Sequence, residues 1–180
     1  MRIALITALF MGSFVVPAHA AALNTEKAPS TPPIVPIDIS IPSAKIFAAI
    51  IPVGTTTTNN LDTPHNFTQA GWYKYGTLPG QIGNAVIDGH VDNGGSIPGP
   101  FKHLDSVHAG DQIAILDSNG KTLHYTVVYS NGYDYRKFPS DLVFNGYVGS
   151  YLKIITCHGQ WLPKEGTYDE RLVVTAVLNP

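Results

Sequence analysis

Short β-rich runs, each ended by glycine or proline, are the feature that most limits how this chain can fold. The 180 residues include 17 glycines and 14 prolines, and valine, isoleucine, threonine and tyrosine are frequent between them. Glycine and proline end regular elements in turns, while β-branched and aromatic residues favour strands over helices. Seven or eight such runs follow one another at short spacing, which is typical of a barrel or a sandwich. The sequence therefore predicts one all-β domain.

One hairpin can be located within this pattern. Residues 112–116 and 121–129 are both β-rich, and they flank the turn Asp117-Ser-Asn-Gly120. An Asn-Gly pair between two such runs is a strong hairpin signal. Residues 130–150, which contain Pro139 and three glycines, are instead predicted to be a long connection. Connections of that length in a small domain are usually functional.

The N-terminus has the pattern of a secretory signal peptide. Arg2 precedes an apolar run from Ile3 to Val16, and Ala18-His19-Ala20 fits a cleavage site. We favour a cleaved signal peptide over residues 1–20. An uncleaved membrane anchor is the alternative, because the apolar stretch counted on through Leu23 reaches about 20 residues, the length of a membrane span.

A proline-rich linker is predicted to follow, over residues 21–40, and the folded domain is expected to occupy residues 41–180. With either reading of the N-terminus the domain works outside the cytoplasm. We expect it to be secreted, or anchored to the membrane at the cell surface.

Charge and histidine spacing argue against two classes of function. The net charge is −2 and only 13% of the residues are charged, without runs of one sign. Nucleic acid is therefore not an expected partner. No metal or other cofactor is expected either, because four histidines spread along the domain lack the spacing of metal ligands. These histidines are His65, His103, His108 and His124.

Cys157 is the only cysteine of the chain, and it ends an apolar strand predicted from Leu152 to Ile155. A lone cysteine cannot form a disulfide within the chain, and it makes a poor structural metal site. Cys157 is therefore either a buried inert thiol or a nucleophile.

Two further residues at strand ends favour the nucleophile. His90 ends a predicted strand that begins at Asn84, and Arg171 begins a valine-rich strand. A neighbouring cation stabilises a thiolate, so His90 could activate Cys157 and then protonate a leaving amine. Arg171 could hold an oxyanion. Each signal is weak alone, since such a histidine or arginine is more often structural.

Taken together, the sequence motifs around these residues resemble those of the sortase family, and the resemblance extends from about Ile41 to the C-terminus. Lys153-Ile-Ile-Thr-Cys157 is similar to the T-L-x-T-C strand end of sortases, Gly89-His90 to their G-H motif, and Arg171-Leu-Val-Val-Thr-Ala176 to the strand that begins at their arginine. Four more segments are similar to the compact class E and F sortases: Ala70-Gly-Trp-Tyr73, Leu78-Pro-Gly80, Gly99-Pro-Phe101 and Ala109-Gly-Asp111.

The resemblance implies an eight-stranded sortase-type β-barrel with one or two short helices, and the activity of a cysteine transpeptidase. Cys157 would attack the Thr–Gly bond of an LPxTG-type sorting signal and form a thioester. His90 would act as general acid and then as base, and Arg171 would stabilise the oxyanion. The implied partners are the sorting-signal peptide of a surface protein and an amine acceptor, either a cell-wall peptide or a pilin lysine. The predicted substrate-binding residues are Ile155, Thr156 and His158.

The chain departs from the family pattern at three positions. Lys153 and Ile154 replace the usual threonine and leucine, and Asp88 stands where relatives often carry a small residue. Other cysteine enzymes fit less well, because L,D-transpeptidases have a Ser-His-Gly-Cys-x-Arg cluster and papain-like proteases place the cysteine before the histidine. Two alternatives stay open: a non-catalytic secreted β-barrel that binds peptides, and a sortase-like peptidase that only hydrolyses.

Overall fold

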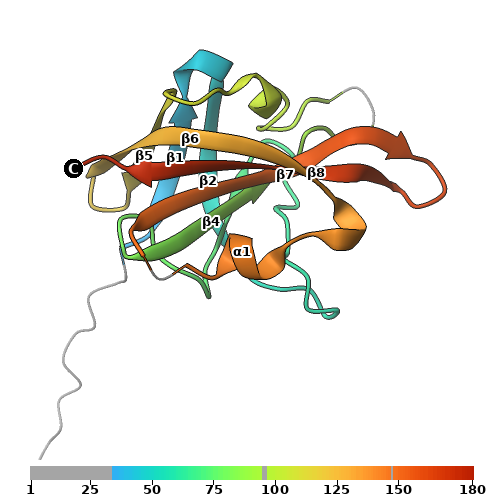
Figure 1. Cartoon of the computed structure of the whole chain (residues 1–180), viewed down its shortest axis with the longest axis horizontal. Coiled ribbons are helices and arrows are strands. Elements are labelled where there is room, and N and C mark those ends of the chain that lie inside the picture. Colours follow the sequence, from blue (N-terminus) through green and yellow to red (C-terminus); the bar gives the residue numbers. More distant parts are fainter. Residues whose placement is uncertain (1–33, 95–96, 147) are drawn as a thin grey trace, which may run out of the picture. The chain divides into compact units, whose positions relative to one another are not determined.

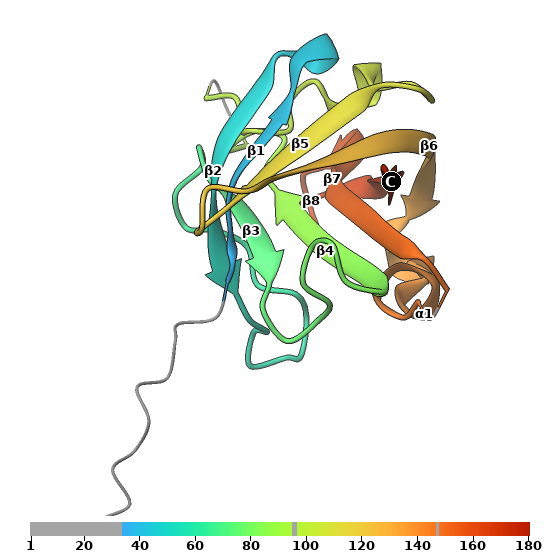
Figure 2. The same ribbon diagram turned by 90° about the vertical axis from the view of Figure 1, so that its left-hand side faces the viewer.

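The computed structural model describes residues 34–94, 97–146 and 148–180. Eight strands close into one barrel in the order β1-β2-β3-β4-β7-β8-β6-β5 (Figures 1 and 2). The predicted eight-stranded barrel is confirmed. Among the described residues it carries one α-helix and three short 3-10 turns. The elements are β1 (Pro36–Ile41), η1 (Pro42–Ala44), β2 (Ile46–Val53), β3 (Ala70–Tyr73), β4 (Gly83–Gly89), η2 (Leu104–Ser106), β5 (Gln112–Asp117), β6 (Thr122–Asp134), η3 (Tyr135–Lys137), α1 (Ser140–Phe144), β7 (Ser150–Leu162) and β8 (Thr167–Leu178).

Strand alternation divides the apolar residues between two clusters. The larger cluster fills the barrel and includes Ile87 of β4, Ile154 of β7 and Val174 of β8. Neighbouring residues on these strands point the other way, because successive side chains of a strand face opposite sides. Outward-facing residues such as Ile155 form the second cluster together with Val143 of α1. Helix α1 therefore covers the outer face of β4 and β7, as Figure 1 shows.

The predicted hairpin is β5–β6. Gly120 has a φ of 81°, which glycine adopts without strain, and its N–H donates to the Asp117 carbonyl at 3.0 Å. The connection predicted over residues 130–150 is shorter in the structure. Strand β6 runs on to Asp134, because residues 130–134 pair with residues 174–170 of β8. Turn η3 and helix α1 occupy the next part of the connection.

The barrel begins a few residues before the predicted start at Ile41. Strand β1 starts at Pro36 and pairs with both β2 and β5, so the end of the predicted linker is part of the sheet. The predicted signal peptide or anchor over residues 1–20 lies outside the described residues. In the described part of the chain, no helix has the length and apolar character needed to cross a membrane.

Candidate active site

Strand register brings His90, Cys157 and Arg171 into one row on the outer face of the barrel. Cys157 and Arg171 are direct partners in the antiparallel pair β7–β8. On the other side of β7, Asp88 of β4 is level with Ile155 in a parallel pair. Continuing that register by two residues places His90 level with Cys157. Adjacent strands lie about 4.8 Å apart, so the backbone of Cys157 lies between the backbone positions of His90 and Arg171.

The Cys157 thiol is partly buried, and burial is the main influence on its charge. Burial raises the pKa of the thiol, since a thiolate loses hydration there. The positive charge of Arg171 lowers this pKa, and the carboxyls of Asp92 and Asp88 raise it. The net result is a raised pKa. The resting residue is therefore mainly a thiol at neutral pH, and its proton must go to a base when it reacts.

His90 is held by the loop of residues 54–69, which joins β2 to β3. Its Nε2 lies 3.0 Å from the Pro64 carbonyl oxygen. A carbonyl only accepts, so Nε2 carries the hydrogen in this contact and Nδ1 is the nitrogen left to exchange a proton. The Phe67 ring packs on the imidazole with 4.4 Å between ring centroids. The loop thus fixes both the position and the orientation of His90.

Close packing at the end of β4 explains two of the sequence motifs. Gly89 faces Phe101, and a Cβ at residue 89 would lie 2.7 Å from the buried Phe101 ring. Gly99 lies against the His90 backbone, where a Cβ would overlap the His90 carbonyl oxygen. The Phe101 N–H donates to that carbonyl at 3.1 Å. The motifs Gly89-His90 and Gly99-Pro-Phe101 are therefore parts of one packed unit that positions His90.

Replacement of Gly99 by alanine is expected to displace His90. The added methyl group must push the His90 backbone aside, which should cost about 1–3 kcal/mol of stability. A displacement of about 1 Å at a catalytic group can lower turnover by about a hundredfold. Urea unfolding and peptide cleavage measure the two effects. The matched control is Gly54→Ala, where the new methyl would meet mainly the exposed Tyr75 ring, which can move away. Equal losses in both variants would contradict the packing role of Gly99.

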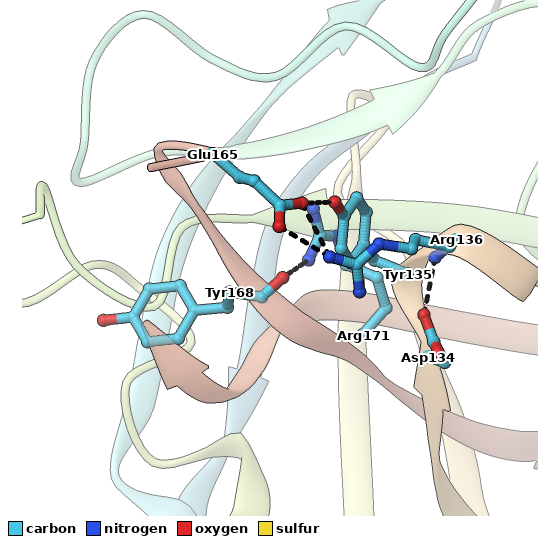
Figure 3. A network of polar contacts seen from close by, with 6 residues as sticks. All are labelled: Asp134, Tyr135, Arg136, Glu165, Tyr168 and Arg171. Carbon is cyan, nitrogen blue, oxygen red and sulfur yellow. Dashed lines mark hydrogen bonds and ion pairs between the residues drawn. The ribbon is translucent and has the colours of Figure 1, made fainter. Parts of the chain in front are cut away.

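Arg171 is fixed by its own hairpin and by turn η3 (Figure 3). Its Nη1 donates to the carbonyls of Tyr168 at 3.0 Å and Glu170 at 2.9 Å, and its Nη2 donates to the Thr167 hydroxyl at 2.9 Å. The guanidinium carbon lies 5.4 Å from the centre of the Tyr135 ring. Because arginine has five N–H donors, Nε–H and one hydrogen of Nη2 are left over for a substrate.

The ring over Arg171 is held in turn by a small polar network. The Tyr135 hydroxyl donates to Glu165, and Arg136 binds both oxygens of Glu165, at 2.6 and 2.8 Å (Figure 3). Glu165 lies in the β7–β8 turn, whereas Tyr135 and Arg136 lie in η3. This network joins η3 to the hairpin on the side of the site where Arg171 lies.

Asp92 and Tyr168 form a second polar pair close to Cys157. The Tyr168 hydroxyl donates to Asp92 at 2.7 Å, and Gly94 and Lys102 also contact this carboxylate. The bond to Asp92 is the largest influence that raises the pKa of Tyr168 to about 12. Partial burial, the largest single influence on Asp92, raises the pKa of its carboxyl. The hydrogen bonds from Tyr168 and Gly94 and the charge of Lys102 together outweigh burial and keep this pKa below the usual value. Tyr168 is therefore a neutral phenol and Asp92 a carboxylate at neutral pH.

Two hollows meet at Cys157. One is a groove of about 760 Å³ that also contains His90 and Arg171 in its lining. The other, of about 370 Å³, lies towards Phe101 and Tyr168 and shares Cys157 and Thr156 with the first. Cys157 and Thr156 therefore lie between the two hollows.

The predicted substrate-binding residues lie in different places around these hollows. Ile155 lines the groove, and it is largely buried. The Thr156 side chain is buried, and its hydroxyl donates to the Gly89 carbonyl at 2.8 Å, which ties the end of β4 to β7. His158 lines the smaller hollow, and its Nε2 lies 4.0 Å from Glu170.

Several residues that hold His90 and Arg171 in place carry no signal in the sequence. Pro64, Phe67 and Tyr135 lie in irregular segments without periodicity, and only the folded barrel places them against His90 and Arg171. Within the described ranges, no group of three or more histidine, cysteine, aspartate or glutamate side chains is arranged to hold a metal ion.

A family comparison agrees with this geometry. The model of the sortase domain matches residues 39–179. The chain belongs to the sortase family. Sortases are in general cysteine transpeptidases of the cell surface or membrane, which act on sorting-signal proteins and amine acceptors. The resemblance stated from the motifs is thus confirmed for the family, while its class E or F stays a prediction.

Solved sortases share the fold of this chain. A lid mutant of sortase A from Corynebacterium diphtheriae is 26% identical, with a TM-score of 0.63, and the match covers 81% of this chain and 70% of that one. The unmodified C. diphtheriae enzyme is 25% identical, with a TM-score of 0.61, over 82% of this chain and 61% of the other. Sortase C2 of the Group B Streptococcus pilus island 1 is 21% identical, with a TM-score of 0.60, over 80% and 73%. Among curated proteins, none matches this chain significantly.

Proposed function

We propose that this sortase is a cysteine transpeptidase that cleaves the Thr–Gly bond of an LPxTG-type sorting signal and transfers the acyl group to an amine. The observation that carries the proposal is the row of His90, Cys157 and Arg171 across three neighbouring strands. A nucleophile flanked by a proton carrier and a fixed cation is what acyl transfer through a thioester requires. A barrel that only binds peptides would gain nothing from this arrangement.

In the first half of the reaction, Cys157 Sγ bonds to the threonine carbonyl carbon and the thiol proton passes to His90. The carbonyl π electrons move to oxygen, and the free donors of Arg171 hold the resulting oxyanion. The oxyanion then re-forms the carbonyl, the C–N bond breaks, and His90 gives its proton to the departing glycine amine. The products are a thioester on Cys157 and the free C-terminal fragment.

In the second half, an incoming amine attacks the thioester carbonyl carbon. His90 takes a proton from this amine, the C–S bond breaks, and the proton returns to the sulfur. Water in place of the amine would give hydrolysis. The second hollow at Cys157 favours transfer to an amine, because it offers an acceptor its own approach to the sulfur while the acyl group fills the groove.

Product analysis tests the proposal and separates it from hydrolysis. The described domain is incubated with an LPxTG-type peptide, with and without triglycine, and the products are separated by chromatography. We expect an amide-linked product that contains triglycine. A product with a free carboxylate even at high triglycine concentration would instead favour a peptidase that only hydrolyses. No cleavage of any such peptide would favour the non-catalytic barrel.

Replacement of Arg171 by lysine is expected to lower kcat/KM by about a hundredfold, even though the charge is kept. An ammonium group cannot bond two backbone carbonyls and Thr167 and still hold the oxyanion, as the guanidinium can. The measurement is the rate of peptide cleavage. The comparison variant is Arg136→Lys, which keeps an ion pair with Glu165 and should cost less than about fivefold. An unchanged rate in Arg171→Lys would contradict the proposed role.

The predicted location and partners fit this chemistry. A secreted or membrane-anchored enzyme at the cell surface would meet sorting signals of surface proteins as they emerge, and the acceptor would be a cell-wall peptide or a pilin lysine. Sequencing the N-terminus of the protein isolated from its host decides between cleavage after residue 20 and a retained anchor.

A further inference from the structure

Asp88 is a buried acid in the groove for which the mechanism above has no use. It lies one step below the catalytic row on the outer face of β4, level with Ile155. Its side chain is 6% exposed and belongs to the lining of the groove. Among the described residues, its Oδ1 has no hydrogen-bond partner. Burying a carboxyl oxygen without a partner lowers the stability of the fold, so such a group calls for an explanation.

The surroundings of Asp88 are shaped to hold it. Gly71 of β3 is its direct partner, and a Cβ at residue 71 would lie only 2.5 Å from Asp88 Oδ1. Glycine at this position therefore leaves the space that the carboxyl fills. The Thr63 side chain, from the loop of residues 54–69, lies close enough to the carboxyl to lower its pKa. The next residue of that loop, Pro64, supplies the carbonyl that receives the His90 Nε2–H.

We propose that Asp88 is a positioning residue of the reaction, which couples the loop that holds His90 to the charge of Cys157. This proposal rests on the nucleophilic role of Cys157 given above. Two adjacent residues of the loop connect Asp88 to His90: Thr63 acts on the Asp88 carboxyl, and the Pro64 carbonyl contacts His90 Nε2 at 3.0 Å. The connection to Cys157 is electrostatic, because a carboxylate at residue 88 disfavours the thiolate.

The proton of Asp88 then controls Cys157 near neutral pH. Burial, the largest influence, raises the pKa of Asp88 to about 7; Thr63 lowers this pKa, and the charge of Asp62 raises it. Below about pH 7 Asp88 is neutral and does not oppose the thiolate. Above that pH it is charged, and each further thiolate must form beside a carboxylate. The thiolate therefore gains less from each rise in pH around pH 7 than it would beside a group that does not ionise.

Other titratable and charged groups face the same part of the groove. They come from the elements packed around Asp88 and are Asp62 of the loop, Tyr73 of β3, His90 at the end of β4, Tyr135 and Arg136 of η3, Asp141 of α1, Cys157 of β7 and Arg171 of β8. The charge of Asp62 raises the pKa of Asp88, so Asp62 offers an independent way to move the titration.

The test is the rate of Cys157 alkylation by iodoacetamide between about pH 5 and pH 9, which reports the thiolate alone. In the wild type, the logarithm of the rate should rise with pH, flatten around pH 7 and then rise again. Above the flattening, the rate should be about three- to tenfold lower than the line extrapolated from below pH 7. Asp88→Asn keeps the shape of the side chain but cannot ionise, so the flattening should vanish and alkylation above pH 7 should be faster by the same factor.

Three further variants make the test specific. Thr63→Val removes a group that lowers the pKa of Asp88, so the flattening should move to higher pH. Asp62→Asn removes a charge that raises this pKa, so the flattening should move to lower pH. Asp141→Asn removes a carboxyl that lines the same groove but does not act on Cys157, so the wild-type profile should remain. Thr63→Val and Asp62→Asn keep the test valid if Asp88→Asn does not fold, with Asp141→Asn as their control.

The outcomes separate this inference from the proposed function. A wild-type profile without flattening, or a flattening that survives in Asp88→Asn and ignores Asp62→Asn, would overturn the role of Asp88. The same proteins are then given a sorting peptide. Acyl-enzyme formation without the flattening would leave the transpeptidase and remove Asp88 from its mechanism. If the flattening is seen but no acyl-enzyme forms, the effect of Asp88 on the Cys157 thiol stands, and the proposed transpeptidase reaction is contradicted.

Discussion

Replacement of Cys157 by alanine is expected to abolish cleavage of sorting peptides, with a loss of at least about a thousandfold. The sulfur forms the only covalent bond to the substrate in the proposed reaction, and the chain contains no second cysteine that could replace it. The measurement is the release of the C-terminal fragment from a fluorescent LPxTG-type peptide.

The structure of the Cys157→Ala variant should be preserved, so the loss can be assigned to chemistry. Cys157 is only partly buried and lies outside both apolar clusters, so the smaller side chain should leave little cavity. Unfolding by urea should stay within about 1 kcal/mol of the wild type. A variant that is folded and still cleaves the peptide at the wild-type rate would contradict the assignment of the nucleophile.

Replacement of His90 by alanine is expected to lower kcat/KM by about a hundred- to ten-thousandfold. The raised pKa of the Cys157 thiol means that a base must take the proton as the sulfur attacks. The structure places His90 level with Cys157 in the lining of the same groove, and Pro64 and Phe67 fix the imidazole. In its absence, water must carry protons to the leaving amine and from the incoming one.

A second histidine serves as the control for this variant. His124 lies exposed on β6, outside the lining of the groove, so His124→Ala should cleave the peptide as fast as the wild type. The pH profile provides a further check, because loss of the proton carrier should change its shape as well as its height. An activity of His90→Ala equal to that of His124→Ala would rule out proton transfer by His90.

The sequence was sufficient to predict the elements that obey local rules. The β5–β6 hairpin follows from its Asn-Gly turn, and β4 and the first half of β7, which lead to His90 and Cys157, follow from their apolar runs. The predicted ends of the last two strands are wrong, because β7 continues past Cys157 to Leu162 and β8 begins before Arg171, at Thr167, where the two strands pair with each other. The order of the motifs that contain His90, Cys157 and Arg171 pointed to the family that the whole-domain comparison then showed.

Non-local contacts explain what the sequence could not predict. Strand β6 is long because β8 pairs with it as far as Asp134. No local sequence pattern predicts this extension. The β2–β3 loop has no periodicity, yet Pro64 and Phe67 fix His90. The sequence already showed that Asp88 stands where relatives often carry a small residue. Its burial against Gly71 and Thr63 depends on how β3 and the loop pack against β4.

The central claim is that Cys157 forms a thioester with a sorting signal, and intact-protein mass spectrometry tests it most directly. The domain is mixed with an LPxTG-type peptide, quenched in acid and weighed, and the modified residue is located by peptide mapping. We predict an added mass equal to the acyl fragment ending in threonine, attached to Cys157, which disappears on addition of triglycine as the amide product forms. Cleavage of the peptide with no adduct on Cys157 under any quench condition, or an adduct on another residue, would contradict the account.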